Sequence, residues 1–542
     1  MFAAINAFLT SSVSEYFLNK SLRFRSSANA YLNRTPTTTG SRTTFTWSGW
    51  VKRGALGTGS GNRRAIFSSG RTDGSPQNGL VFRFFDDQIN ASSGGGVSLS
   101  LTSSAVYRDP AAWYHLVFAV DTTQGTASNR VKIYVNGAQV TSFGTATYPS
   151  ASQSFDINTS SYTAYNGAEN DTATLVYFFD GEMAEVNFVD GQALAPTAFG
   201  ASSIYNQWLP KKYAGTYGTN GFYLPFTNTT STTTLVADSS GNGNNWTPNN
   251  ISLTAGSTYD SLTDVPTLTS TTVANYCVLN PLVPSANTFS SGNLQVTTSA
   301  SPNAKFVSTM GVSSNKYYME FGFSTIDNVP IGVTSTTDPQ TYLGAADGTT
   351  SVSFWPAAAN TAIYVNGVSI AWSGSSTTWA NSDIAGLALD ADSKTISLYK
   401  NGVLVGAAFS YSSYWTSTTY FAGGNYVSKI YYANFGQRPF AYTPPSGFLP
   451  LNTFNIAAGT VTTSGTFTGN LSTDGPMVYL NGTPTAMTIN GNAVTFGTHA
   501  DKLANGFKVR SSSASYNASG SNTYVATTVA AVLKYENAQP NP

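Results

Sequence analysis

The stretch DIAGLALDADSKTISLYKNGVLVG, residues 383–406, decides the fold of this chain. It predicts a strand over residues 384–389, a tight turn at 390–394, a second strand over 395–399 and a hairpin turn at Asn401-Gly402. A type I′ turn needs a positive φ at both central residues, and Asn-Gly adopts that conformation readily. The segment therefore predicts antiparallel β-structure made of short, tightly connected strands.

The same hairpin signal recurs on both sides of this stretch. Asn-Gly follows an alternating apolar run in VKIYVNGAQV (131–140), AIYVNGVSI (362–370) and VYLNGTPT (478–485). The segment FTWSGWVKR (45–53) alternates as a half-buried strand does, with Phe45, Trp47, Gly49 and Val51 on one face and Trp50 on the other. The irregular spacing of these signals excludes a solenoid and indicates sandwiches or barrels.

Composition narrows the class of protein. The chain has 542 residues, which predicts three or four domains of about 100–200 residues each. Lys+Arg and Asp+Glu both number 26, and the balance without a basic run excludes nucleic acid as a partner. No apolar run approaches the roughly 18 residues of a membrane span, so we expect no membrane insertion. The first residues lack the positive region of a signal peptide, which predicts cytoplasmic synthesis without secretion.

The chain divides into five predicted parts. Residues 1–20 carry apolar side chains at helical spacing, among them Phe2, Ile5 and Phe17, and predict an amphipathic helix. Two interpretations stay open for that helix: packing on its own domain, or anchoring in a neighbouring subunit. A β-sandwich over 21–205, a connecting segment over 206–288 packed partly on it, a second sandwich over 289–452 and a small β domain over 453–542 follow.

Both predicted sandwiches resemble known families. Residues 21–200 resemble the concanavalin A-like, laminin-G-like jelly rolls through SLRFRSSANAYL, FTWSGWVKR, WYHLVFAVD, VKIYVNGAQV and GEMAEVNFVDGQALAPTAFG. The second sandwich resembles a SPRY domain through KYYMEFGFS, IGVTS, the run 383–406 and NFGQRPFAYTPPSGFLPL. The fold class expected is therefore all-β, as tandem antiparallel β-sandwiches with a short N-terminal helix and a small C-terminal β module.

The whole chain is similar to virion proteins of marine tailed bacteriophages, through YGTNGFYLPF, DSSGNGNNW and ANGFKVRSSSASYNASG as well as the sandwiches. The resemblance implies a structural protein on the virion surface, a tail fibre or a head fibre or decoration protein, assembled in the host cytoplasm. It also implies docking to other virion proteins through the N-terminal segment, a homo-oligomer with a trimer favoured, and contact with a host glycan or receptor. The alternatives are a carbohydrate-binding module and a polysaccharide-degrading tailspike.

Three carboxylates are the strongest candidates for chemistry. Asp180, Glu182 and Glu185 have the spacing at which jelly-roll glucanases carry their catalytic carboxylates on one strand. Here Asp stands where the nucleophilic Glu belongs, so we predict a structural strand with no catalytic residue. His115 lies in an apolar strand, and the chain has no Gly-x-Ser-x-Gly elbow. The sequence therefore predicts a protein that is not an enzyme.

Metal and cofactor sites are not assigned to any residue. Cys277 is the only cysteine, which excludes an intrachain disulfide, and we expect it to be buried. Together with His115 and His499 it provides too few ligands for a zinc site. Asp86, Asp87, Asp238 and residues 242–245 offer oxygen ligands for Ca²⁺, but turns rich in Asp, Asn and Gly also form for backbone reasons.

Four tryptophans are candidate glycan or receptor contacts. Trp355, Trp372, Trp379 and Trp415 lie in loop-rich parts of the SPRY-like unit, and an exposed indole can stack on a sugar ring. The alternative interpretation places them in the core of the sandwich.

Overall fold

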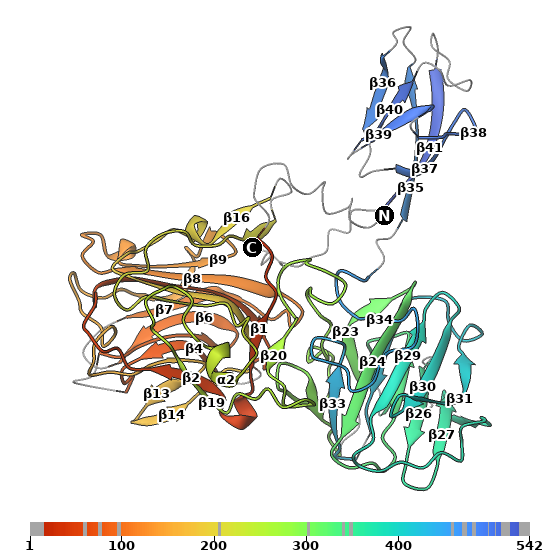
Figure 1. Cartoon of the computed structure of the whole chain (residues 1–542), viewed down its shortest axis with the longest axis horizontal. Helices are drawn as coiled ribbons and strands as arrows, with labels where there is room; N and C mark the ends of the chain where they lie inside the picture. The colour runs from red at the N-terminus through yellow and green to blue at the C-terminus, as the bar shows by residue number, and fades with distance from the viewer. Residues whose placement is uncertain are drawn as a thin grey trace. The chain divides into compact units, whose positions relative to one another are not determined.

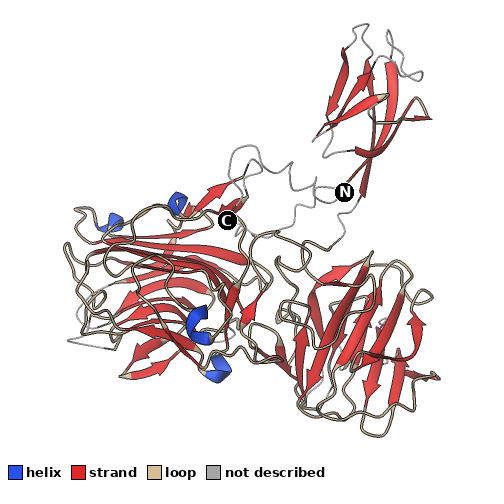
Figure 2. Ribbon diagram, viewed as in Figure 1, coloured by secondary structure: helices blue, strands red, loops and turns tan. Residues whose placement is uncertain are grey.

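The computed structural model describes residues 16–57, 62–73, 78–94, 99–203, 207–300, 304–338, 342–345, 351–425, 427–456, 460–468, 474–479, 484–496, 498–503, 506–510 and 521–529. Antiparallel strands form nearly all of its secondary structure (Figure 2). The chain falls into two compact units, one centred on residues 13–455 and the other on residues 456–535. The predicted all-β fold class of tandem sandwiches is confirmed.

The first sandwich consists of two sheets (Figure 1). Sheet one has the order β10 (Ala138–Gln139), β9 (Val131–Val135), β8 (Trp113–Asp121), β3 (Thr44–Arg53), β15 (Gly181–Asp190), β1 (Ser21–Phe24) and β20 (Ser261–Leu262), with β18 (Phe222–Leu224) on β15. Sheet two has the order β11 (Phe143–Thr147), β7 (Ser100–Val106), β6 (Gln88–Ser93), β5 (Leu80–Phe85), β4 (Arg63–Ser69), β12 (Ala164–Asn166), β2 (Tyr31–Arg34) and β19 (Thr247–Asn249). Strands β18, β19 and β20 come from the segment predicted to connect the sandwiches.

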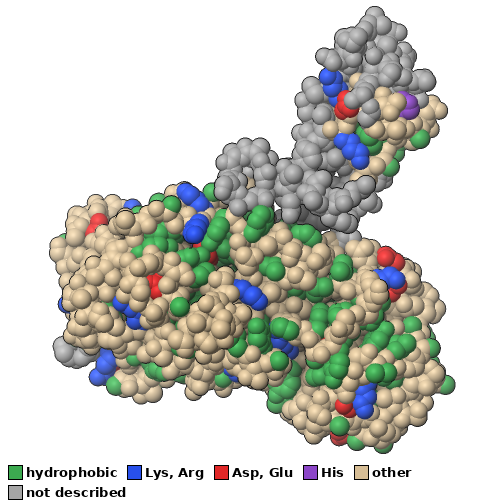
Figure 3. Space-filling model, in the orientation of Figure 1, with side chains coloured by type: hydrophobic (Ala, Val, Ile, Leu, Met, Phe, Trp, Pro, Cys, Tyr) green, Lys and Arg blue, Asp and Glu red, His purple; other side chains and the backbone are tan. Residues whose placement is uncertain are grey.

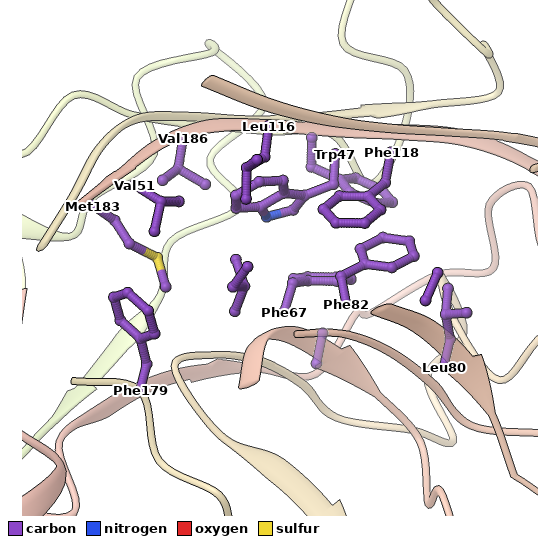
Figure 4. Close-up of a cluster of buried hydrophobic side chains, with 14 of the residues drawn as sticks. Trp47, Val51, Phe67, Leu80, Phe82, Leu116, Phe118, Phe179, Met183 and Val186 are labelled. Carbon is purple, nitrogen blue, oxygen red and sulfur yellow. The ribbon is translucent and has the colours of Figure 1, made fainter. Parts of the chain in front are cut away.

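The core of this sandwich follows the alternation in the sequence. Phe45, Trp47 and Val51 of β3 point between the sheets, whereas Trp50 packs in a different cluster on the opposite face. Across the core, Phe82 of β5 stacks on Phe118 of β8 with ring centroids 4.1 Å apart (Figure 4). Burial of each such side chain contributes about 1.5–3 kcal/mol, so the core holds the two sheets together. Further segments can then pack on the outer faces of the sheets.

The second sandwich also consists of two sheets. One has the order β21 (Thr288–Ser290), β22 (Gln295–Thr297), β33 (Ile430–Asn434), β24 (Lys316–Phe323), β29 (Ala385–Asp390), β30 (Thr395–Lys400) and β31 (Val403–Ser410), with β34 (Leu449–Pro450) parallel to β24. The other has the order β23 (Phe306–Val312), β32 (Thr419–Gly423), β25 (Ile331–Thr334), β26 (Ser351–Pro356), β27 (Thr361–Val365) and β28 (Val368–Ile370). The strands predicted from residues 383–406 are β29 and β30, with bounds shifted by one residue.

Three of the predicted Asn-Gly turns have the expected backbone. Asn401 and Gly402 have φ of 49° and 78°, and the turns at Asn136 and Asn366 match them. The turn at 481–482 lies outside the described residues. A further Asn-Gly turn, at Asn490 with φ of 49° and Gly491 with φ of 79°, is one that we did not predict.

Valine at position 402 is expected to destabilise the second sandwich by about 1–3 kcal/mol, because a β-branched residue at positive φ is strained. A Cβ there would also lie 3.0 Å from Cδ1 of Tyr442. Thermal unfolding of Gly402→Val and of a control, Gly125→Val, measures the effect. Gly125 has no atom within 4 Å of an added Cβ. Equal melting temperatures for the two variants would contradict the assignment of the turn.

The C-terminal unit contains two small sheets. One has the order β35 (Thr460–Thr468), β41 (Ser521–Val529), β37 (Pro484–Ile489) and β38 (Asn492–Ala493), and the other the order β36 (Asp474–Tyr479), β40 (Gly506–Arg510) and β39 (Ala500–Leu503). Ile489, Phe507 and Val509 are fully buried in its small core. This unit therefore has a hydrophobic core of its own.

The helix predicted over residues 1–20 does not reach its expected end. Residues 16–20 have no helical structure, and residues 1–15 lie outside the described part of the chain. The backbone of Leu18 bonds instead to distant side chains: its N–H donates to Oγ1 of Thr267 at 3.1 Å, and its carbonyl accepts from Oγ1 of Thr269 at 2.9 Å. Among the described residues the α-helix α2 (Thr232–Leu235) is one turn long, and no described helix has the length and apolar character needed to cross a membrane.

Candidate functional site

Glu182 of strand β15 belongs to a row of side chains across the outer face of sheet one. Strand pairing sets Arg23 of β1, Glu182 of β15, Lys52 of β3 and Trp113 of β8 side by side. Core residues such as Met183 and Val51 point to the other side of the same strands. All four residues of the row are at most 1% exposed, so another part of the chain must cover this face.

The cover comes from residues 257–293. The guanidinium of Arg23 donates to Asp260 Oδ1 at 3.1 Å and to the carbonyls of Ser257 and Tyr259. Lys52 Nζ donates to Asp264 Oδ2 at 2.7 Å, to Asn275 Oδ1 at 2.8 Å and to the carbonyl of Tyr276 at 2.8 Å. Buried charges are tolerated when they are paired and hydrogen-bonded in this way. The outer face of sheet one around Glu182 is therefore covered by this chain's own residues.

Asp180 joins the two sandwiches. One carboxylate oxygen accepts from the N–H of Gly292 at 2.7 Å, and the other accepts from the N–H of Ser291 at 3.0 Å and from both the N–H and the hydroxyl of Ser26. Ser291 and Gly292 directly follow strand β21 of the second sandwich. The carboxylate is 1% exposed and has structural partners on both oxygens, so a substrate cannot reach it.

Glu182 and Glu185 are buried under different segments. Burial raises the pKa of Glu182 well above its ordinary range, and Lys52 pairs with Asp264 rather than with Glu182. Glu185 sits at a β-bulge with φ of 54°, where Oε1 accepts from Tyr16 and Oε2 from Tyr223, both at 2.9 Å. Burial raises the pKa of Glu185 to about 7. Its carboxylate therefore holds the segment around Tyr16 against the sheet.

The variant Glu185→Gln is expected to gain stability over the wild type as pH rises. In the wild type, the pKa of the Glu185 carboxyl is about 7 in the folded protein, against an ordinary value of 4.5. The contribution of this group to the free energy of unfolding is therefore complete below pH 4.5 and is lost as the pH rises through 7. Glutamine does not titrate, and the difference in unfolding free energy should shift in its favour by up to about 3 kcal/mol between pH 4.5 and 8.

Urea unfolding of both proteins across this pH range measures that shift. An exposed carboxylate variant, Asp338→Asn, serves as the control and should give a flat difference. A Glu185→Gln curve parallel to the wild type would contradict the burial of this carboxyl.

His115 lacks the arrangement of a catalytic base. The indole N–H of Trp208 donates to Nδ1 at 2.9 Å, so Nε2 carries the ring proton and donates to Oγ of Ser48 at 2.9 Å. A Ser-His-Asp triad needs the opposite polarity, with Nε2 free to accept the serine proton. The ring lies between the indoles of Trp50 and Trp208, and burial lowers its pKa to about 3. It is the packed strand histidine expected from the sequence.

The other singled-out groups have structural partners. Asp87 accepts from Arg53 and Arg108, Asp86 accepts from the N–H of Asn62, and Asp238 holds its own turn through the N–H groups of Ser240 and Asn244. Within the described residues, no three His, Cys, Asp or Glu side chains gather as a metal site. Cys277 is buried as predicted, and burial raises the pKa of its thiol to about 11.

The four tryptophans of the second sandwich differ in exposure. Trp379 and Trp415 are only 4% and 7% exposed, and their indole N–H groups donate to Thr361 and Thr419. This corrects the expectation for these two residues, because a sugar cannot reach a ring that packs inside the sandwich. Trp372 is half-buried and ties its loop to β31 through a hydrogen bond to the carbonyl of Ala407 at 2.7 Å.

Trp355 remains accessible on the outer face of its sheet. Its neighbour Phe354 enters the core, whereas the indole of Trp355 lies 4.9 Å from Tyr364 and 5.5 Å from Tyr342, measured between ring centroids. All three rings are half-buried. Sequence reasoning missed both tyrosines, although the alternation of AIYVNG places Tyr364 opposite the core. The pairing of β26 with β27 places Tyr364 next to Trp355, and this pairing is seen only in the structure.

Comparison with known proteins assigns the class of fold. The family described as the concanavalin A-like lectin/glucanases superfamily matches residues 26–197. The matched residues lie in the first sandwich, whose sheet one contains the strand with the glucanase-like spacing of carboxylates. The first sandwich is concanavalin A-like, as expected from its motifs. Among curated proteins, none matches the chain.

Solved structures are similar to parts of this chain at low identity. The TRIM65 PSpry domain is 13% identical, with 29% of this chain and 92% of that chain covered and a TM-score of 0.25. The SPRY domain of human HERC1 is 18% identical, with 26% and 87% covered and a TM-score of 0.21. A putative carbohydrate binding protein from Bacteroides ovatus is 17% identical, with 44% and 59% covered and a TM-score of 0.29.

Proposed function

We propose that this chain is a non-catalytic surface protein that contacts glycans, and that it serves as a structural component of a tailed-phage virion. The proposal rests on the burial of the outer face of sheet one. Asp180, Glu182 and Glu185 are each at most 4% exposed there, under segments of the same chain. Glycoside hydrolysis needs a pair of carboxyl groups on either side of a bound sugar, so this face supports a structural role.

The Trp355 surface, formed by Trp355, Tyr342 and Tyr364, is the glycan contact that we propose on the second sandwich. Its rings are half-buried, so one face of each can be fixed by packing while the other meets a pyranose ring. The Trp355 indole N–H is held by Ser353 Oγ at 2.8 Å, which fixes the orientation of the ring. A fixed aromatic side chain loses little conformational freedom on binding.

Affinity electrophoresis in gels that contain neutral polysaccharides tests this contact. The full chain should be retarded by at least one of dextran, mannan or xyloglucan, and Trp355→Ala should lose most of that retardation. The matched control is Trp379→Phe, which changes a buried indole of the same sandwich. Equal mobility of Trp355→Ala and the wild type in every gel would reject the Trp355 surface as a glycan contact.

The virion setting rests on the resemblance of the sequence to phage structural proteins. A low charge content, 10% of residues, suits a protein held in a large assembly, and Figure 3 shows few charged side chains scattered over the visible face. We propose a tail fibre or a head fibre or decoration protein, docked through residues 1–20 and assembled as a trimer. Electron microscopy of particles that carry the chain, with and without residues 1–20, tests both the position and the docking segment.

A further inference from the structure

The outer face of sheet two carries a second group of half-buried aromatic rings. Tyr31 of β2 lies 6.1 Å from Tyr165 of β12 and 6.0 Å from Phe178, between ring centroids. All three rings are half-buried, and the neighbouring Leu32 points into the core. Phe178 reaches this face because the chain leaves the hairpin of β13 (Glu169–Asp171) and β14 (Thr174–Val176) and runs beside β4, where the carbonyl of Tyr177 accepts from Ala65 N–H at 2.8 Å.

An arginine continues the same group of side chains. The guanidinium of Arg63 lies 4.9 Å from the ring centroid of Tyr177 and 5.7 Å from that of Phe85. Cation–π contacts with two rings hold the group in place. The Nε atom of Arg63 is buried without a hydrogen-bond partner. Its Nη1 atom lies 3.8 Å from Oδ2 of Asp171. The side chain is 31% exposed, so a ligand can reach the guanidinium.

The contrast with Arg83 on the same face supports a role for Arg63 in binding. Arg83 donates to both carboxylate oxygens of Glu169, at 2.9 and 2.8 Å, and is 7% exposed. Arg83 is therefore a structural arginine with a bidentate partner, the arrangement in which guanidinium and carboxylate fit best. Arg63 has the same chemistry and rigid support but no bidentate partner within the described residues.

Hydrogen-bonding groups border the rings. Nδ2 of Asn249 donates to Oδ1 of Asn33 at 2.7 Å beside Tyr31, and both side chains are half-buried. Amide groups next to aromatic faces are suited to sugar hydroxyls, because each amide can both donate and accept. An apolar surface of a partner protein would instead fit a patch of aromatic rings without such hydrogen-bonding groups.

We propose that the sheet-two strip, Phe85, Arg63, Tyr177, Phe178, Tyr31 and Tyr165, binds a polyuronate: an acidic polysaccharide whose pyranose rings stack on the aromatic side chains and whose carboxylate pairs with Arg63. The positive charge of Arg63 selects an anionic ligand, and the planar guanidinium can donate two parallel hydrogen bonds to a carboxylate. The strip lies on the first sandwich and is separate from the Trp355 surface, so it adds a second binding site of different charge preference.

Binding of the full chain to polygalacturonate and to its fully methyl-esterified form tests this site. The two ligands share a backbone and differ in charge. We expect the esterified form to bind about tenfold more weakly at low salt, and Arg63→Gln to lower the affinity for polygalacturonate by about the same factor while leaving the esterified form unaffected. Tyr31→Ala should weaken both ligands, and circular dichroism checks that each variant keeps its sheets.

Two control variants separate this site from the Trp355 surface. Trp355→Ala should bind polygalacturonate as the wild type does, and Arg63→Lys should recover only part of the lost affinity, because an ammonium cannot form the paired hydrogen bonds. Failure of polygalacturonate to bind, equal binding by Arg63→Gln, or loss of binding in Trp355→Ala would each overturn the assignment. If no neutral polysaccharide retards the wild type, the sheet-two strip still stands and only the Trp355 surface is rejected.

Discussion

Replacing Asp180 by alanine is expected to lower the free energy of unfolding of the sandwich unit by about 3–5 kcal/mol. The carboxylate accepts four hydrogen bonds, from Gly292, Ser291 and two groups of Ser26, and alanine leaves all of these donors without their partner. Hydrogen bonds to a buried charge are about twice as strong as neutral ones, so the loss of four of them is costly.

Urea unfolding of the full chain, followed by tryptophan fluorescence, measures the loss. Asp180→Asn is the matched variant: it keeps one acceptor oxygen and the shape of the side chain, and should fall between alanine and the wild type. A change within about 0.5 kcal/mol for the alanine variant, the range of ordinary surface substitutions, would show that Asp180 does not join the sandwiches.

Replacing Lys52 by methionine is expected to have an effect of similar size, about 3–5 kcal/mol, because it leaves the Asp264 carboxylate buried without its cation. Nζ of Lys52 has three partners in the segment that covers sheet one, at 2.7, 2.8 and 2.8 Å. Methionine fills a similar volume, so the loss reports the charge and hydrogen bonds rather than a cavity.

The control for Lys52 is an exposed lysine with a single partner. Nζ of Lys211 donates to the carbonyl of Thr197 at 3.1 Å in an exposed position, and Lys211→Met should change stability by less than about 0.5 kcal/mol. Equal unfolding midpoints for Lys52→Met and Lys211→Met would contradict the buried ion pair.

The strands were predictable because their signals are local. Alternation in residues 45–53 correctly separated the core side chains of β3 from Trp50, and Asn-Gly marked the hairpins at Asn136, Asn366 and Asn401. These features depend on neighbours one or two residues away, so one sequence is enough to reveal them. The short Asn490-Gly491 turn was missed because the strands around it lack strong alternation.

The environment of the candidate site was not predictable in the same way. The spacing of Asp180, Glu182 and Glu185 identified one strand, but the cover over it comes from residues 257–293, which are distant in sequence. Trp379 and Trp355 looked equivalent in the sequence, yet one is 4% exposed and the other faces outward. Likewise Tyr31 and Phe178 meet only because β12 pairs with β2 and the chain then passes beside β4. Such contacts follow from topology rather than from periodicity.

We propose that Asp180, Glu182 and Glu185 support structure and not hydrolysis. The most direct measurement is the release of reducing ends from polysaccharides that the full chain binds, polygalacturonate and the retarding neutral glycan, with Glu182→Gln alongside and its fold checked by circular dichroism. The account predicts no release above buffer for either protein, because Glu182 is 1% exposed beneath the covering segment. Sustained release by the wild type that disappears in a folded Glu182→Gln variant would contradict it.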